Sequence, residues 1–222
     1  MQELNALRRG YEQKIAQKKS GFELMAKMIG YTIQEMGKAG LLENEVEVWG
    51  RLKSFKSAYE NYHKKAIDDC FGIRIIAKND KDLEKIQQQL DKIFIVEKTK
   101  DHGKKSDTKY NAVHQMIRMN EHYADTHKLN IEGMPIIEIQ FWNNELENMC
   151  ETGEISYSKY KHKDLKKIQT VYKQNPFEVY RNLPTYYEIR GNKIRMLSAE
   201  ETLRKIYPDL VCGEHSDIEI SM

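Results

Sequence analysis

Nine residues, 69–77, constrain the fold of this chain more than any other stretch. They read Asp-Cys-Phe-Gly-Ile-Arg-Ile-Ile-Ala and end at a polar Lys-Asn-Asp triplet. A short, mostly β-branched apolar run with such an end predicts a buried β-strand. Three of its residues do not suit a strand that serves packing alone. Asp69 stands at the entrance, Arg74 interrupts the apolar run, and Gly72 lacks a side chain where a ligand could approach.

The chemistry of these three residues points to a phosphate ligand. Mg²⁺ binds one or two carboxylates together with phosphate oxygens, and a guanidinium matches the geometry of phosphate. Asp69 and Arg74 on one strand therefore suggest a site for a metal ion and a polyphosphate. On this stretch alone, a structural ion pair between the two residues is an equally good interpretation.

A second predicted strand surrounds Glu138 and favours the metal interpretation. The apolar Ile137 and Ile139 alternate with the polar Glu138 and Gln140, so the two polar side chains share one face of the strand. If both predicted strands belong to one sheet, Glu138 can join Asp69 in binding the same cation.

Composition sets broad limits on the class of protein. The chain has 222 residues, of which 40% are hydrophobic and 32% charged, so it can form a core and stay in solution. A net charge of +2 is too small to argue for nucleic-acid binding by itself. Three well-separated cysteines without metal-ligand spacing fit a reducing compartment. With no signal peptide and no run of about 18 apolar residues, we expect a cytoplasmic location.

Hydrophobic periodicity predicts an alternation of helices and strands. Helical spacing dominates up to residue 45, with a break between two helices at Ser20-Gly21. The predicted strands are residues 46–49, 69–77, 94–96, 110–118 and 135–142, and a hairpin follows over about 186–196. Asn79 or Asp80 is predicted to cap a helix whose buried stripe is Leu83, Ile86 and Leu90, and Ser198 with Glu201 forms a capping box.

These elements predict an α+β fold with a mixed sheet of about five strands flanked by helices. We expect three parts: N-terminal helices over 1–45, a core over 46–175, and a C-terminal hairpin-helix extension over 176–222. Cations gather near the proposed site, and for Arg51 and Lys53 a phosphate contact is the favoured role.

The motifs, in this order, resemble the synthetase domain of the RelA/SpoT family over about residues 46–163. The matching segments are Gly50-Arg51-Leu52-Lys53 with Ser57 for G-R-x-K…S, Asp69 to Arg74 for D-x-x-G-x-R, Tyr110 to His114 for Y-R-S-L-H, Glu138-Ile139-Gln140 for E-V-Q, and Glu151-Thr152-Gly153 with Lys159-Tyr160-Lys161 for the segments that follow. The resemblance implies a nucleotidyltransferase-like fold and transfer of the β,γ-pyrophosphate of ATP to a ribose 3′-hydroxyl.

The residues and the resemblance together assign expected roles. Glu138 and Asp69 are the expected catalytic residues and the ligands of Mg²⁺. The expected ATP contacts are Arg51, Lys53, Ser57, Lys64 and Arg74. The expected acceptor contacts are Tyr110, Asn111, His114 and Gln140, with Tyr110 stacked on the acceptor base. Whether Glu138 accepts the proton of the attacking hydroxyl or only binds metal stays open.

This chain departs from the family pattern mainly on the acceptor side. Lys109 stands where the family has Gly, Asn111 replaces an Arg, and the segment 141–143 reads Phe-Trp-Asn instead of I-R-T. The length leaves no room for the family's hydrolase domain or its regulatory half. We therefore expect a small, stand-alone synthetase with a donor site that is kept and an acceptor pocket that is changed.

Two acceptors remain open. One is GDP or GTP, which would make an alarmone. The other, which we favour, is the 3′-CCA end of tRNA, as in the toxin branch of small alarmone synthetases, where a neutralising antitoxin protein is the expected partner. Candidate contacts to the tRNA backbone are Lys18, Lys19, Lys159, Lys161, Lys163, Lys166 and Lys167. A solvated basic face is the alternative for these lysines. A different kind of function is also open: the chain could be a non-catalytic nucleotide-binding module. Retention of both carboxylates, Asp69 and Glu138, argues against this alternative.

Overall fold

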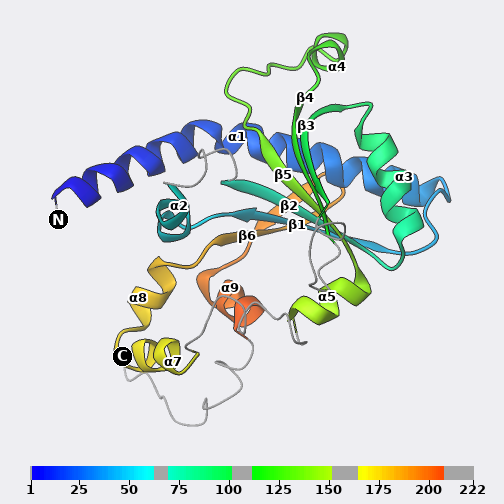
Figure 1. The fold of residues 1–222 in the computed structure, drawn as a ribbon. Coiled ribbons are helices and arrows are strands. Elements are labelled where there is room, and N and C mark those ends of the chain that lie inside the picture. Colours follow the sequence, from blue (N-terminus) through cyan, green and yellow to red (C-terminus); the bar gives the residue numbers. More distant parts are fainter. Residues whose placement is uncertain (1, 63–69, 102–111, 152–164, 208–222) are drawn as a thin grey trace.

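The computed structural model describes residues 2–62, 70–101, 112–151 and 165–207 (Figure 1). The strands are β1 (Val46–Leu52), β2 (Phe71–Ala77), β3 (Phe94–Asp101), β4 (Val113–Met119), β5 (Ile137–Asn143), β6 (Thr185–Arg190) and β7 (Lys193–Met196). The helices are α1 (Gln2–Lys38), α2 (Phe55–Tyr62), α3 (Asp80–Leu90), α4 (Glu121–Thr126), α5 (Asn144–Glu151), α7 (Leu165–Gln174), α8 (Pro176–Arg181) and α9 (Ala199–Ile206).

The described strands form one mixed sheet in the order β3-β4-β5-β2-β1-β6-β7. Only β2 and β5 pair in parallel among them, and the other neighbours are antiparallel. The predicted α+β class is confirmed, but the sheet has seven strands where about five were expected. The difference is the C-terminal hairpin, which joins the sheet because β6 pairs with β1 and buries Tyr187 and Ile189 in the same core.

One face of the sheet carries the main core. Helices α1 and α3 lie on this side, and α5 and α9 lie on the other (Figure 1). Alternate residues of β2, such as Ile73 and Ile75, are buried against Phe22, Met25 and Ile29 of α1. The predicted buried strand is therefore confirmed. The α3 prediction holds as well, since Asn79 caps the helix and its buried residues include Leu83, Ile86 and Leu90.

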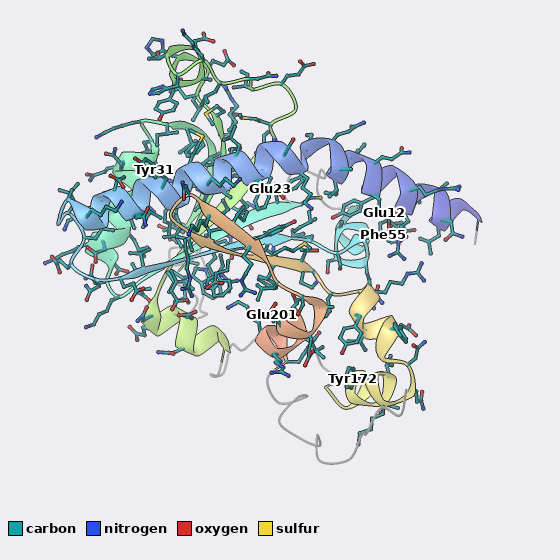
Figure 2. All side chains as sticks on the ribbon, turned by 180° about the vertical axis from the view of Figure 1, so that it is seen from behind. Glu12, Glu23, Tyr31, Phe55, Tyr172 and Glu201 are labelled. Atoms are coloured by element: carbon teal, nitrogen blue, oxygen red, sulfur yellow. The ribbon has the colours of Figure 1, made fainter. Side chains whose placement is uncertain are left out.

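The N-terminal segment is one continuous helix of 37 residues, so the predicted break at Gly21 is wrong. A Cβ added at Gly21 would lie 2.9 Å from Met134 Cα, and one at Gly30 would lie 2.4 Å from Gly191 O. These glycines let the helix backbone approach its neighbours closely instead of ending the helix. Figure 2 views the molecule from behind and shows α1 running across the sheet on the near side.

Helix α9 follows the hairpin and packs on the face of the sheet opposite α1. The predicted capping box is present, because Ser198 Oγ accepts from Glu201 N while the Glu201 carboxylate accepts from Ser198 N. Helices α4 and α8 were not predicted. The three-part domain division stays a proposal, and the sheet extends across its second boundary through β6. No helix in the described ranges is long and apolar enough to cross a membrane.

Candidate active site

Polar side chains occupy the sheet face opposite α1, at the pairing of β2 with β5. In this register Gly72 lies beside Glu138, and Arg74 lies beside Gln140. Side chains two positions apart on a strand share a face, which places Arg74, Glu138, Gln140 and Trp142 together. The sequence prediction that the two strands lie in one sheet is confirmed.

A chain of hydrogen bonds links these groups. Gln140 Nε2 donates to Glu138 Oε2 at 2.9 Å, and Gln140 Oε1 accepts from Arg74 Nε and Nη2 at 3.3 Å each. From β4, His114 Nδ1 lies 3.3 Å from Glu138 Oε1. An ionised carboxylate only accepts, so His114 Nδ1 must carry a proton in this contact. Both oxygens of Glu138 are thereby oriented, and Gln140 joins the carboxylate to Arg74.

Glu138 is buried yet charged. Burial raises the pKa of this carboxyl, because only 8% of the residue is exposed. The hydrogen bond and charge of His114, the hydrogen bond from Gln140 and the charge of Arg51 outweigh burial and lower the pKa of Glu138 to about 2. The sheet therefore holds a fixed negative charge beside two arginines.

This depressed pKa makes stability depend on pH. The carboxyl titrates at about 2 in the folded state and at 4.5 without these contacts. Below pH 4.5 the unfolded chain binds the extra proton, so the contribution is complete above pH 4.5 and is lost as pH falls towards 2. We expect about 3 kcal/mol of stability to disappear over this window. Urea unfolding at pH 6 and pH 2.5 should show a loss of stability that is larger by about this amount in the wild type than in Glu138→Gln, whereas equal losses in the two proteins would contradict it.

A small pocket adjoins Glu138 on the same face. It is lined by Trp49, Arg51, Gly72, Ile73, Arg74, Gln140 and Tyr186. Arg51 of β1 lies beside Gly72 in the antiparallel register. A Cβ added at Gly72 would meet only ordinary contacts, at 3.6 Å from Glu138 O and 3.9 Å from Arg51 O. Protein packing therefore does not require glycine here, and the role of Gly72 in admitting a ligand stays a prediction.

The residues present fit part of a magnesium site. Glu138 offers an ionised carboxylate, the kind of oxygen ligand that Mg²⁺ prefers, next to arginines suited to phosphate. Mg²⁺ commonly uses only one or two carboxylates and completes its shell with water and phosphate oxygens. The second predicted ligand, Asp69, lies outside the described residues. Within the described ranges, no group of three or more His, Cys, Asp or Glu side chains forms a metal cluster.

Residues 50–165 match the family described as "Region found in RelA / SpoT proteins". This chain belongs to the RelA/SpoT family. The match covers Arg51, Gly72, Arg74 and Gln140, which line the pocket, and Glu138, which is hydrogen-bonded to Gln140.

Solved structures agree on the fold. This RelA/SpoT chain is similar to the small alarmone synthetase 1 from Bacillus subtilis, with 16% identity over 78% of this chain and 91% of that one, at a TM-score of 0.52. A second structure of that synthetase, bound to its product pppGpp, gives 19% identity over 63% and 76% of the two chains, at a TM-score of 0.50. At sequence identities this low, the structural similarity establishes a shared fold and nothing more. No curated protein sequence matches this chain significantly.

The remaining predicted ATP residues that the structure describes lie close to the pocket strands. Lys53 follows β1, and its backbone N–H donates to Cys70 O at 2.9 Å, directly before β2. Tyr11 of α1 donates to Lys53 O at 2.7 Å. Ser57 lies in the first turn of α2, where its N–H donates to Ser54 Oγ at 3.3 Å. The phosphate roles of Lys53 and Ser57 stay proposals.

Several predicted site residues cannot be placed. Asp69, Lys64, Tyr110, Asn111, Lys159, Lys161 and Lys163 lie outside the described residues. Lys166 and Lys167 fall within α7. Lys18 and Lys19 belong to α1, on the side of the sheet away from Glu138, and Lys19 Nζ lies 3.9 Å from a carboxylate oxygen of Glu23. The predicted tRNA-binding surface therefore stays a proposal.

Sequence reasoning missed two tryptophans at this RelA/SpoT site. The Arg74 guanidinium carbon lies 3.5 Å from the centre of the Trp142 ring, and Lys205 Nζ of α9 lies 3.9 Å from the Trp49 ring. The alternation of side chains along a strand could have indicated that both tryptophans face the site, since Trp142 shares a strand face with Gln140 and Trp49 shares one with Arg51. No sequence pattern could have indicated Lys205, because it reaches β1 only through the packing of α9 against the sheet.

Proposed function

We propose that this chain is an ATP-dependent pyrophosphokinase, which transfers the β,γ-pyrophosphate of ATP to the 3′-hydroxyl of a ribose. One observation carries the proposal: an ionised, buried Glu138 is joined through Gln140 to Arg74, at the edge of a pocket that Arg51 also lines. Membership of the RelA/SpoT family supports the same reaction class.

The proposed catalysis is electrostatic. Phosphoryl-type transfer gains most of its acceleration from positioning and from neutralising charge on the transferred group. In this chain Arg51 and Arg74 would supply that charge, with Lys53, Lys64 and Ser57 as further proposed contacts. Glu138 and Asp69 would hold Mg²⁺, which would supply positive charge next to the phosphates of ATP. A carboxyl with a pKa of about 2 is a weak proton acceptor, which favours the cation-binding role of Glu138 over the general-base role.

For the acceptor, we favour the 3′-CCA end of tRNA. The support is the changed acceptor segment around Asn111 and the lysines that interleave with aromatics from Lys159 to Lys167. His114 and Gln140 both contact Glu138, so an acceptor hydroxyl bound by them would lie near the carboxylate. A chain that modifies tRNA in this way would inhibit translation as a toxin and would require a neutralising antitoxin protein.

A second candidate is (p)ppGpp synthesis from GDP or GTP. The small alarmone synthetase 1 from Bacillus subtilis was solved with its product pppGpp, and that protein shares the fold of this chain. In this case Tyr110 would stack on guanine, and the product would be an alarmone of the stringent response.

One labelling experiment separates these candidates. ATP labelled in the γ-phosphate is offered with GDP, with GTP and with bulk tRNA, and products are resolved while AMP release is measured. We expect AMP release and label in tRNA, and no label in tRNA whose 3′-terminal ribose has been oxidised with periodate. Label found only in a guanosine nucleotide would select the second candidate. No AMP release with any acceptor would overturn the enzyme assignment and favour a non-catalytic nucleotide-binding module.

A further inference from the structure

Trp142 provides a platform beneath Arg74. Trp142 is 5% exposed and packs in a cluster with Ile76, Ala112 and Leu146. The Arg74 guanidinium lies over its ring, with 3.5 Å between the guanidinium carbon and the ring centre. This separation is well inside the distance at which a cation and an aromatic face attract each other.

Two contacts of different kinds hold the same guanidinium. Gln140 Oε1 accepts from Nε and Nη2, which lie along one edge of the planar group. Trp142 contacts its face. An edge contact alone would leave the plane able to rotate about the bonded edge, and a face contact alone would let the group turn within its plane. Together the two contacts fix both its plane and its direction.

The orientation matters because Arg74 also lines the pocket beside Arg51. An arginine has many rotamers, and immobilising such a side chain on binding reduces affinity. Arg74 has already lost that freedom in the described structure. A guanidinium stacked on an indole is also partly dehydrated before any ligand arrives, which strengthens its attraction for an anion.

We propose that Trp142 is a positioning residue, which holds the Arg74 guanidinium in the orientation that binds the nucleoside triphosphate. This inference rests on the proposed function for the identity of the ligand. A tryptophan at position 142 departs from the pattern of the family. The resemblance places an arginine of the I-R-T segment where this chain has Trp142, and a second cation there would repel Arg74, whereas an indole attracts it.

The kinetic test compares Trp142→Leu with Trp142→Phe. We expect Trp142→Leu to raise the KM for ATP about tenfold and to lower kcat as well, because a displaced Arg74 guanidinium both binds ATP less well and neutralises the transferred group less well. Trp142→Phe keeps an aromatic face and should stay within about threefold of the wild-type KM. Leu146→Ala is the matched control, because it removes side-chain volume from the same cluster. It should lower thermal stability without changing the KM for ATP.

Equal KM values in Trp142→Leu and Leu146→Ala would overturn the proposal. A second measurement does not depend on turnover. The Nε–Hε signal of Arg74, assigned by its disappearance in Arg74→Lys, should be shifted by the ring current of the indole. Trp142→Leu should abolish this shift, and Trp142→Phe should keep part of it. If the wild type neither binds a non-hydrolysable ATP analogue nor transfers pyrophosphate, the proposed function fails. If it does both while the Arg74 signal is unmoved in Trp142→Leu, the positioning role fails.

Discussion

Glu138→Gln is expected to lower pyrophosphate transfer from ATP at least about a thousandfold. The substitution keeps the size of the side chain, but it replaces one accepting oxygen with an NH2 donor and removes the charge that His114, Gln140 and Arg51 stabilise. If Glu138 binds the cation that accompanies ATP, a neutral amide is a much weaker ligand. Release of AMP from labelled ATP, measured at saturating acceptor, checks the result.

Controls separate this loss from unfolding. Circular dichroism and thermal unfolding at pH 7 should show a folded Glu138→Gln protein. Glu84→Gln, an exposed position on α3, should retain full activity. Asp69→Asn should match the loss in Glu138→Gln, because both carboxylates are proposed to share one ion. Wild-type activity in either site variant would refute the proposed site.

Gly30→Ala is expected to reduce the free energy of unfolding by about 1–3 kcal/mol, although alanine favours helix more than glycine does. The added Cβ would lie 2.4 Å from Gly191 O and 2.6 Å from Ile189 Cγ2. Because a backbone carbonyl is one of these atoms, the helix or the β6–β7 turn must shift. Urea unfolding measures the loss.

The same substitution at Gly10 provides the comparison. Gly10 lies in the same helix, and a Cβ added there would meet nothing within 4 Å. We expect Gly10→Ala to raise stability by about 0.5–1 kcal/mol through helix propensity alone. If both alanine variants stabilise the protein, the close packing of α1 on the turn is contradicted.

The sequence alone was sufficient for features that depend on neighbours along the chain. A short apolar run identified β2. Alternation identified β5 and placed Glu138 and Gln140 on one face, because side-chain direction in a strand has a fixed period. Ser198 was recognised as a cap, and Asn79 was one of two candidates, because capping joins residues three apart. The resemblance to the family predicted that Arg51 and Arg74 belong to one site, and in the structure both residues line the same pocket.

Contacts between distant segments were decided only by the tertiary structure. Gly21 looked like a helix break, because a sequence cannot show that Met134 approaches the helix there. The hairpin was predicted as an extension outside the core, but in the structure β6 pairs with β1. The pKa of Glu138 depends on His114, which is 24 positions away, and the plane of Arg74 depends on Trp142 in another strand. Local periodicity fixes which way a side chain points, whereas strand order and helix packing determine what it meets.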